Sequence, residues 1–498
     1  MNRRKFLAAA GASLAGPALL DLQGKAQASR RAPQRPNIIV IICDDLGHGD
    51  LGCYGSNLST PHLDQLAREG VRLTHHTTPH PICSASRAAL LTGLYPTRVN
   101  TPNVFWPLDN GGMSLDAATL GNVMQSAGYE TMAIGKWHLG DTKPYLPTSR
   151  GFDDFYGVGY SVDMDPLPLL RGTHVAEPEA DRDQLTQQYT AQAVEFIGKP
   201  RGVTPFFLYF AHSYPHIPLH ASPAFRGKSP LGLYGDVVHE IDWSVGAVLE
   251  ALRARRLEEN TLVIFTSDHG PWYQGSTGDL RGRKGTTYEG GVRIPFIARL
   301  PGALPAGRRN DVLTSHLDLL PTLARLSGAR LPAAALGGTL DGIDIWGVLQ
   351  DGSAGSNGPV RPALLNFSNW NLESARWNQW KLHLTRASVG AFLPAPKGGI
   401  VTYMLQHPEL YNVVDDPKES YDVAAQYPDV VAGIQRSVAA QMAALPERVQ
   451  NAWAEAGRHP SSQWMADGSY NPAAEHMKPD TRGYLTGPVA AQLLQRYQ

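Results

Sequence analysis

Four uninterrupted apolar runs recur along the first 270 residues of the chain. They are NIIVIIC (37–43), TMAIG (131–135), PFFLYFA (205–211) and TLVIFTS (261–267). Runs of this length, rich in β-branched and aromatic residues, are typical of strands buried on both faces of a sheet. The stretches between them have a different pattern, with apolar residues at helical spacing at 63–69, 185–197 and 238–256. Strands that alternate with helices predict an α/β fold, with a large, mainly parallel sheet flanked by helices.

The pattern changes near residue 350. The stretch QDGSAGSNGPVRP (350–362) is rich in Gly, Ser and Asn, has no periodicity and is typical of a linker or long loop. We expect a larger domain over 36–355 and a smaller C-terminal α+β subdomain over 361–498, built on an antiparallel sheet. Its strand candidates are 363–369, 375–384, 399–404 and 409–413, and 429–445 is a helix candidate.

Residues 1–28 resemble an export signal. They begin with basic residues, continue with an apolar run over 6–20 and end at the small-x-small site Ala26-Gln27-Ala28. The run is shorter than the roughly 20 residues of a membrane-spanning helix, so no permanent membrane anchor is expected. Arg3 and Arg4 resemble a twin-arginine signal, which would make the twin-arginine export machinery a partner and the periplasm the destination. The alternative is an ordinary secretory signal.

Charge and cysteine content narrow the class of protein. Lys and Arg total 44 and Asp and Glu total 45, a net charge of −1, which argues against a nucleic-acid partner. The chain has only three cysteines, so a disulfide framework does not hold it together. The odd number leaves at least one cysteine without an internal partner.

Polar residues follow each of the four buried strand candidates. Because functional crevices lie at the carboxyl ends of parallel strands, these residues are expected to converge on one site. They are Asp44 and Asp45 after the first strand, Lys136 and His138 after the second, His212 and His216 after the third, and Asp268 and His269 after the fourth.

Three of these residues are acids that would need a cation if they lay together. Asp44, Asp45 and Asp268 would raise one another's pKa steeply, and a hard divalent ion such as Ca²⁺ or Mg²⁺ would relieve that conflict. Taken singly, each motif could also be a simple cap or turn.

A second set of residues carries positive charge or hydrogen-bond donors and would favour an anionic group. Each member alone could also be an ordinary surface residue. The set is Arg87, Lys136, His138, His216 and Lys284.

Cys83 precedes SASRAALL and so lies at the start of a predicted helix. That position favours a thiolate, as in a cysteine hydrolase. A soft thiolate, however, is mismatched with a cage of hard oxygen ligands. The remaining interpretation from the residues alone is a buried, small apolar group.

Several motifs in order resemble the type I sulfatases, in particular the arylsulfatase A-like group of the alkaline phosphatase-like superfamily. CSASR (83–87) is similar to the family pattern Cys-x-Pro/Ala-x-Arg and is followed by LLTG. The resemblance extends through DDLGHGDLGCYG (44–55), GKWHLG (135–140), SDHG (267–270) and KGTTYEGGVRIPFI (284–297). It runs from about residue 37 to about residue 420 and implies that 36–355 is the catalytic domain.

The resemblance implies that a formylglycine-generating enzyme oxidises Cys83 to Cα-formylglycine, whose hydrate attacks the sulfur of a sulfate monoester on an aryl or carbohydrate group. It further implies one Ca²⁺ held by Asp44, Asp45, Asp268, His269 and the modified Cys83. Arg87, Lys136 and His138 would hold and activate the hydrate. Lys284 and His216 would bind the sulfate, and His216 would protonate the leaving alcohol; His216 is preferred to His212 because it lies in the family's His-x-Pro step.

Two positions depart from the commoner family pattern, and two rival functions are also considered. Ala85 replaces the usual proline, and His269 stands where many relatives have Asn or Gln. One rival is a phosphonate or phosphate ester hydrolase of the same superfamily. The other is an unmodified homologue that binds sulfate esters without cleaving them.

Overall fold

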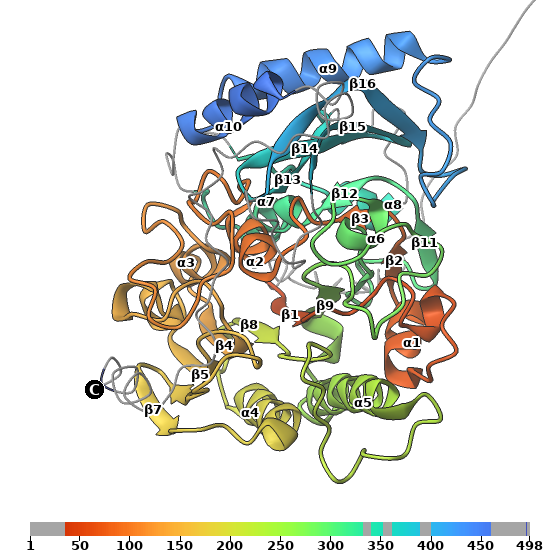
Figure 1. Cartoon of the computed structure of the whole chain (residues 1–498). Helices are drawn as coiled ribbons and strands as arrows, with labels where there is room; N and C mark the ends of the chain where they lie inside the picture. Colours follow the sequence, from red (N-terminus) through yellow and green to blue (C-terminus); the bar gives the residue numbers. More distant parts are fainter. Residues whose placement is uncertain (1–34, 332–339, 352–360, 389–399, 460–494, 496–498) are drawn as a thin grey trace, which may run out of the picture. The chain divides into compact units, whose positions relative to one another are not determined.

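The computed structural model describes residues 35–331, 340–351, 361–388, 400–459 and 495 (Figure 1). The predicted signal at 1–28 and most of the predicted linker, residues 352–360, lie outside the described residues. Among the described residues, no helix is long and apolar enough to cross a membrane.

The larger sheet has ten strands among the described residues, in the order β11-β2-β10-β9-β1-β8-β4-β5-β6-β7. Its central neighbours β9, β1, β8, β4 and β5 are parallel, whereas β10, β6 and β7 join it in antiparallel pairs. The bounds are β1 Asn37–Cys43, β2 Val71–Leu73, β4 Glu130–Lys136, β5 Asp154–Val158, β6 Leu169–Arg171, β7 His174–Glu177, β8 Phe206–Ala211, β9 Thr261–Ser267, β10 Phe296–Arg299 and β11 Arg308–Asn310. Two further strands, β3 His76–Thr77 and β12 Thr314–Ser315, form a separate pair.

The four apolar runs form the strands that they predict. All seven residues of β1 are buried, as are all seven of β9, because helices cover both faces of the sheet. In Figure 1, α1, α4 and α5 lie on one side of the sheet and α2, α3 and α7 on the other. The helices of the larger domain are α1 Pro61–Arg68, α2 Cys83–Thr92, α3 Leu120–Ser126, α4 Leu185–Gly198, α5 Gly232–Ala254, α6 Glu289–Val292, α7 Leu319–Ser327 and α8 Trp346–Asp351.

The C-terminal residues form a separate antiparallel sheet in the order β13-β14-β15-β16, as the sequence predicts. The strands are β13 Leu364–Ser368, β14 Asn371–Trp377, β15 Trp380–Ala387 and β16 Thr402–Asn412, and the helices are α9 Pro428–Met442 and α10 Glu447–Arg458. The single strand expected over 375–384 is instead a hairpin, which turns at Asn378 with a φ of 53°. The candidates 399–404 and 409–413 join in one strand, β16.

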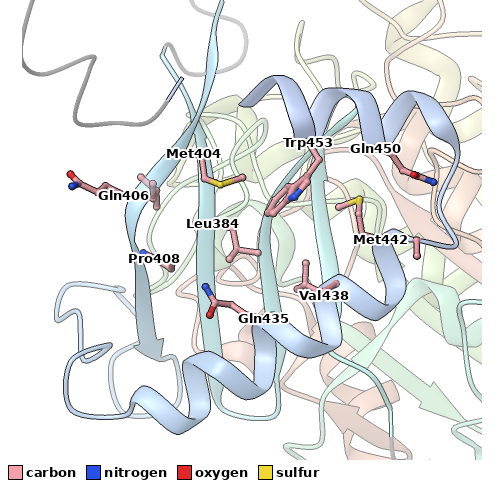
Figure 2. Close-up of a pocket in the computed structure, with 12 residues that line it drawn as sticks. Leu384, Met404, Gln406, Pro408, Gln435, Val438, Met442, Gln450 and Trp453 are labelled. Carbon is pink, nitrogen blue, oxygen red and sulfur yellow. The ribbon is translucent and has the colours of Figure 1, made fainter. Parts of the chain in front are cut away.

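Apolar packing joins the smaller sheet to the larger domain. One buried cluster contains Leu365, Phe367 and Leu382 of the small sheet together with Ala89 of α2 and Leu317. The same cluster contains Val438 and Met442 of α9 and Val449 of α10, and a cavity of about 650 Å³ lies between these helices and the small sheet. Figure 2 shows this cavity, where Leu384, Met404, Val438, Met442 and Trp453 face one another. The cluster between the two sheets places the small sheet behind α2, the helix that begins at Cys83.

Candidate active site

The strands that carry the predicted site residues are neighbours in the order β9-β1-β8-β4. Asp44 and Asp45 follow β1, Asp268 and His269 follow β9, and Lys136 is the last residue of β4. Because these strands are parallel, their carboxyl ends lie at one edge of the sheet. The arrangement that the sequence predicts is therefore present in the backbone.

Cys83 also lies at this edge of the sheet, as the first residue of α2. Every residue of α2 is buried, and Cys83 is 2 % exposed. Its Sγ lies 3.2 Å from Nε2 of His269. Residues 186 positions apart in the chain are thus in direct contact.

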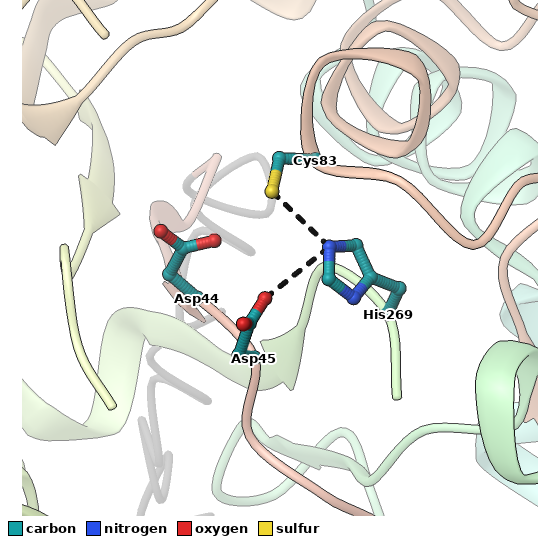
Figure 3. Close-up of side chains that lie close together, drawn as sticks. All are labelled: Asp44, Asp45, Cys83 and His269. Carbon is teal, nitrogen blue, oxygen red and sulfur yellow. Dashed lines mark hydrogen bonds and ion pairs between the residues drawn. The ribbon is translucent and has the colours of Figure 1, made fainter. Parts of the chain in front are cut away.

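Four side chains could hold a metal ion together. Asp44, Asp45, Cys83 and His269 each offer one ligand atom, and these atoms all lie within 4.8 Å of one another. In Figure 3 the Asp45 carboxylate and the Cys83 sulfur both approach the same nitrogen of His269. The distance from Asp45 Oδ1 to His269 Nε2 is 3.4 Å. All four residues are buried, so a cation bound here would be largely removed from water.

Asp268, the fifth predicted ligand, lies beside this group. Its Oδ1 accepts hydrogen bonds from the backbone N–H of Asp45 at 3.1 Å and of His269 at 2.9 Å, and it lies 3.7 Å from His269 Nε2. Its Oδ2 accepts from Nε and Nη2 of Arg87 at 3.2 and 3.1 Å. In this structure Asp268 therefore orients the loops that carry Asp45 and His269.

Each of the three carboxylates has a basic partner. Lys136 Nζ donates to Asp44 at 2.5 Å, and Lys284 Nζ donates to both oxygens of Asp45 at 2.9 Å. With Arg87 on Asp268, three acids and three bases form one buried cluster, which we call the catalytic cluster: Asp44, Asp45, Asp268, Arg87, Lys136 and Lys284. Their formal charges cancel, which makes burial of so many ions tolerable.

Hydrogen bonds fix the tautomers of the two histidines nearest the acids and bases. His269 donates from Nδ1 to the carbonyl of Gly270 at 2.9 Å, which leaves Nε2 as a lone pair directed at Asp45 and Cys83. His216 contacts the Ile217 carbonyl through Nδ1, and its Nε2 accepts from Lys284 Nζ at 2.8 Å.

His138 and His212 behave differently from each other. His138 donates from Nε2 to the carbonyl of Phe105 at 3.0 Å, and its buried Nδ1 has no partner among the described residues. His212 Nε2 lies 3.5 Å from Ser244 Oγ on α5. His212 thus contacts α5, whereas His216 contacts Lys284 of the group of acids and bases.

Burial and charge act in opposite directions on the acids of the catalytic cluster, and burial raises the pKa of Asp268. Burial by itself would raise the pKa of Asp44, but Lys136, together with His216 and Arg87, holds that pKa well below its ordinary value. Burial, followed by the charge of Lys284, lowers the pKa of His216. Burial raises the pKa of the Cys83 thiol, which opposes the thiolate that a cysteine hydrolase would need.

The backbone at the strand ends takes conformations that few residues adopt. Asp45 and His138 have φ values of 65° and 60°, in the left-handed region where non-glycine residues are uncommon and frequently functional. Gly135, just before Lys136, has a φ of 98°, and a Cβ there would lie 1.7 Å from the carbonyl oxygen of Ala211. Only glycine fits between β4 and β8 at this point, which explains why the GKWHLG motif begins with glycine.

The donor set fits a hard divalent cation. One carboxylate oxygen, Asp44 Oδ1, is buried without a hydrogen-bond partner among the described residues, and its nearest cation is Arg87 Nη2 at 3.4 Å. A buried, unpaired carboxylate oxygen is costly unless something positive binds it. Carboxylate oxygens with the free Nε2 of His269 are ligands that such an ion accepts.

Comparison with known proteins decides the family. A family model described as Sulfatase matches residues 36–329, and one described as the C-terminal region of aryl-sulfatase matches residues 360–474. The chain belongs to the sulfatase family.

Its relatives include enzymes that are named for different sulfate esters. The sulfatase is 37 % identical to human arylsulfatase A over 447 residues, which cover 80 % of this chain and 86 % of that relative. It is 38 % identical to N-acetylgalactosamine-6-sulfatase of Canis lupus familiaris, with 67 % of this chain and 70 % of the relative covered. The structure of the PsFucS1 sulfatase from Pseudoalteromonas sp. superposes with a TM-score of 0.73, at 29 % identity and with 82 % and 90 % covered. The protein is a sulfuric ester hydrolase.

Sequence reasoning missed several residues that support the site of this sulfatase. Ser161 Oγ accepts from Lys136 Nζ at 3.0 Å, and nothing in the sequence around it indicates this contact. Ser86 donates to the carbonyl of Asp268 and lies 3.1 Å from Nδ1 of His316. Ser86 is part of CSASR but stands at an unspecified position of the Cys-x-Pro/Ala-x-Arg pattern, so that motif does not indicate its contacts.

A second buried group of charges lies where the small sheet meets the segment that carries Lys284. It links Glu289 of α6 and Glu419 to three basic side chains of the small sheet, Arg376, Lys381 and His383, and we call these five residues the interface cluster. Arg281 donates to the carbonyl of Glu419 at 2.7 Å, and the backbone N–H of Glu289 donates to the Glu419 carboxylate at 2.6 Å. Segment 281–289 is therefore bonded at both ends to the C-terminal part of the chain.

Proposed function

We propose that this sulfatase hydrolyses sulfate monoesters of aryl or carbohydrate groups to the alcohol and inorganic sulfate, through Cys83 oxidised to Cα-formylglycine and beside a bound Ca²⁺. One observation carries the proposal: the Cys83 side chain lies in a buried group with two carboxylates and with Nε2 of His269, whose lone pair is directed into the group. An oxygen nucleophile suits such surroundings better than sulfur, because hard ligands bind hard cations.

Asp44, Asp45, Asp268 and His269 would hold the ion together with the modified residue 83. When bound, Ca²⁺ would supply positive charge for the sulfate oxygens. The hydrated aldehyde would supply the oxygen that attacks sulfur and a second hydroxyl whose proton is lost as the aldehyde reforms and sulfate leaves.

The remaining residues act on the nucleophile. Lys136 and Arg87 lie beside Asp44, next to residue 83 in the same buried group, and hold the hydrate through charge-assisted hydrogen bonds. His138 has its Nδ1 unpaired and its other nitrogen bonded to Phe105, so it can take a proton at Nδ1.

Two further residues act on the sulfate and its alcohol. Lys284 binds the sulfate oxygens, which bear the negative charge of the ester. His216 would protonate the alcohol as it leaves, with the proton that Lys284 Nζ donates to its Nε2. The contact between the two residues supports their acting at one group.

The experiment compares turnover of 4-nitrophenyl sulfate, 4-nitrophenyl phosphate and an aryl phosphonate by protein produced together with a formylglycine-generating enzyme. We expect the sulfate to be the fastest substrate, and a chelator to abolish that turnover until Ca²⁺ is restored. A faster reaction with phosphate or phosphonate would favour the rival hydrolase. Binding of sulfate esters without turnover, with an intact thiol at Cys83, would favour the non-catalytic homologue.

We also propose the maturation route and the division of the chain. Residues 1–28 act as a twin-arginine signal that carries the protein to the periplasm after the cytoplasmic maturation enzyme has modified Cys83, with 36–355 as catalytic domain and 361–498 as C-terminal subdomain. A system that exports folded proteins is compatible with modification before folding. The variant Arg3→Lys with Arg4→Lys should retain the precursor in the cytoplasm, and unchanged export of that variant would contradict the route.

A further inference from the structure

A second concave site lies at the far edge of the large sheet and is lined by arginines. It is a cleft of about 350 Å³ between the 3-10 turn at Gly52–Tyr54, α1, β2 and β11. We call it the arginine cleft, because four of the side chains that line it are arginines: Arg68, Arg72, Arg308 and Arg309. None of its lining residues belongs to the catalytic cluster.

The sheet register forces two of these positive charges together. Strands β2 and β11 are parallel, and Arg309 is the direct partner of Arg72 across the ladder. Like charges opposite one another on neighbouring strands destabilise a sheet. Arg68 joins them from the last turn of α1. A bound anion would relieve this repulsion.

Arg72 is held in place without an acidic partner. Its guanidinium lies over the ring of Tyr54, 5.3 Å from the ring centre. The Tyr54 hydroxyl bonds to the backbone of Leu73 and Phe296, at 2.8 and 2.9 Å, so the ring itself is fixed. Neither Arg72 nor Arg68 has a carboxylate within ion-pair distance among the described residues. Arg72 is thus positioned before any ligand arrives.

The nearby acids neutralise little of this charge. Asp64, which also lines the cleft, accepts from the backbone N–H of Cys53 at 2.7 Å and from Thr60 Oγ1 at 3.1 Å and pairs with none of the arginines. Asp311 pairs with Arg309 at 2.9 Å, but both side chains are more than half exposed, at 55 % and 61 %. An ion pair exposed to that extent contributes little.

We infer that the arginine cleft binds an oxyanion, and specifically a second sulfate group of a sulfated oligosaccharide whose other sulfate lies in the catalytic site. Guanidinium groups bind tetrahedral oxyanions through paired, charge-assisted hydrogen bonds. The choice of a sulfated glycan rests on the proposed function.

The geometry of the sheet separates this site from the catalytic one. Strand β11 lies four strands away from β1, which at roughly 4.8 Å per strand places the two sites about 20 Å apart. A simple aryl sulfate cannot reach both sites, whereas an extended chain can. Two linked contacts would raise affinity for the chain without affecting the small substrate.

The test measures binding of a heparin-derived hexasaccharide to the Cys83→Ala protein by titration calorimetry, so that nothing is hydrolysed. We expect Arg72→Ala with Arg309→Ala to weaken binding about tenfold, and expect added salt to reduce the difference. The matched control is Arg255→Ala with Arg330→Ala, which removes the same charge from exposed positions outside the cleft and should leave binding unchanged. In the Cys83 background both double variants should hydrolyse 4-nitrophenyl sulfate at the wild-type rate.

Three results would overturn the inference: equal binding by the cleft variant and the parent protein, equal weakening by the control, or equally tight binding of a short DNA oligonucleotide, which would indicate a general polyanion surface. Competition by inorganic sulfate but not by neutral sugars would support the oxyanion site. The calorimetry does not depend on catalysis. Loss of turnover in the protein with Cys83 intact, with cleft-dependent binding retained, would therefore contradict the proposed function and leave this inference standing.

Discussion

The two buried charge clusters contain similar groups, yet they satisfy them differently. In the interface cluster both oxygens of Glu289 are bonded, one to Arg376 and the other to Lys381. Glu419 is likewise bonded at both oxygens, to the Glu289 N–H and to His383. In the catalytic cluster and beside it, Asp44 Oδ1 and His138 Nδ1 are buried without hydrogen-bond partners among the described residues, and the nearest cation to Asp44 Oδ1 is Arg87 Nη2 at 3.4 Å.

This difference is the one expected between a structural cluster and a catalytic one. Saturated buried ions hold two parts of a chain in one arrangement, because any rearrangement would leave a charge unpaired. Unsaturated buried atoms are costly, and they are found where a ligand or substrate completes them. Left-handed backbone occurs on both sides of this comparison, at Asp45 and His138 and at Glu419 with a φ of 48°, so it does not separate the two clusters.

The largest expected effect is on turnover. Lys136 and Lys381 are both completely buried lysines bonded to a carboxylate, so they form a matched pair. Lys136→Met should lower kcat for 4-nitrophenyl sulfate by about 100- to 1000-fold, as expected when one donor to a reacting group is lost. Lys381→Met, measured per folded molecule, should change kcat by only a few fold. Similar losses of kcat in the two variants would remove the distinction between the clusters.

The second effect is on stability, and here we expect the larger loss from the change in the interface cluster. Lys381→Met leaves Glu289 and Glu419 short of one cation and should lower the free energy of unfolding by about 3–5 kcal/mol. Urea denaturation followed by tryptophan fluorescence measures it. A drop of less than about 1 kcal/mol would show that Arg376 and Arg293, whose Nη1 lies 3.8 Å from Glu289, compensate for the lost lysine.

Metal removal should act on one cluster only. If Ca²⁺ binds the folded protein at about 100 times its Kd, its removal should lower the free energy of unfolding by about 2.7 kcal/mol and abolish turnover. Removal of Ca²⁺ from the Lys381→Met variant should lower its free energy of unfolding by the same amount, because the substitution lies in the other cluster. A chelator that changed neither stability nor turnover would contradict a metal at Asp44 and Asp45.

The smallest effect concerns pH and two glutamates near segment 281–289. Burial by itself would raise the pKa of Glu289, but Arg376 and Lys381 lower it, so its stabilisation is present above the unfolded value of about 4.3 and is lost as pH falls. Burial raises the pKa of Glu373 to about 7, so its contribution is present below about pH 4 and is lost as pH rises through 7.

The Glu373→Gln variant tests this contrast, since it removes only the second dependence. Between pH 5 and pH 8 the variant should gain about 2.5 kcal/mol of stability relative to the wild type. Thermal unfolding at both values measures the gain. A variant with the wild-type pH dependence would refute the assignment to Glu373.

Much of the fold is predictable from the chain because its central strands are buried on both faces. The runs 37–43 and 261–267 coincide with β1 and β9 to the residue. The short strands β2 and β11 were not predicted, since three residues with a polar centre have no clear period. Helix α5 begins at Gly232, six residues before its predicted start, because Gly-Leu-Tyr-Gly is a weak helix signal.

The candidate site was predictable for a different reason. Its residues follow strands whose adjacency is implied by the fold, and the motifs around Cys83 resemble a known family. The interface cluster has no such signal: Glu289 and Arg376 are 87 positions apart, and each alone is typical of a solvated charge. The pairing of Arg72 with Arg309 likewise depends on a strand register that the sequence does not reveal.

The central claim is that oxygen at residue 83, not sulfur, performs the reaction. Mass spectrometry of the peptide that carries Cys83 gives the modified fraction in preparations made with and without the formylglycine-generating enzyme. Turnover of 4-nitrophenyl sulfate should rise in proportion to that fraction and should vanish when only the thiol is present. Full activity in a preparation with an unmodified thiol at Cys83 would contradict the account.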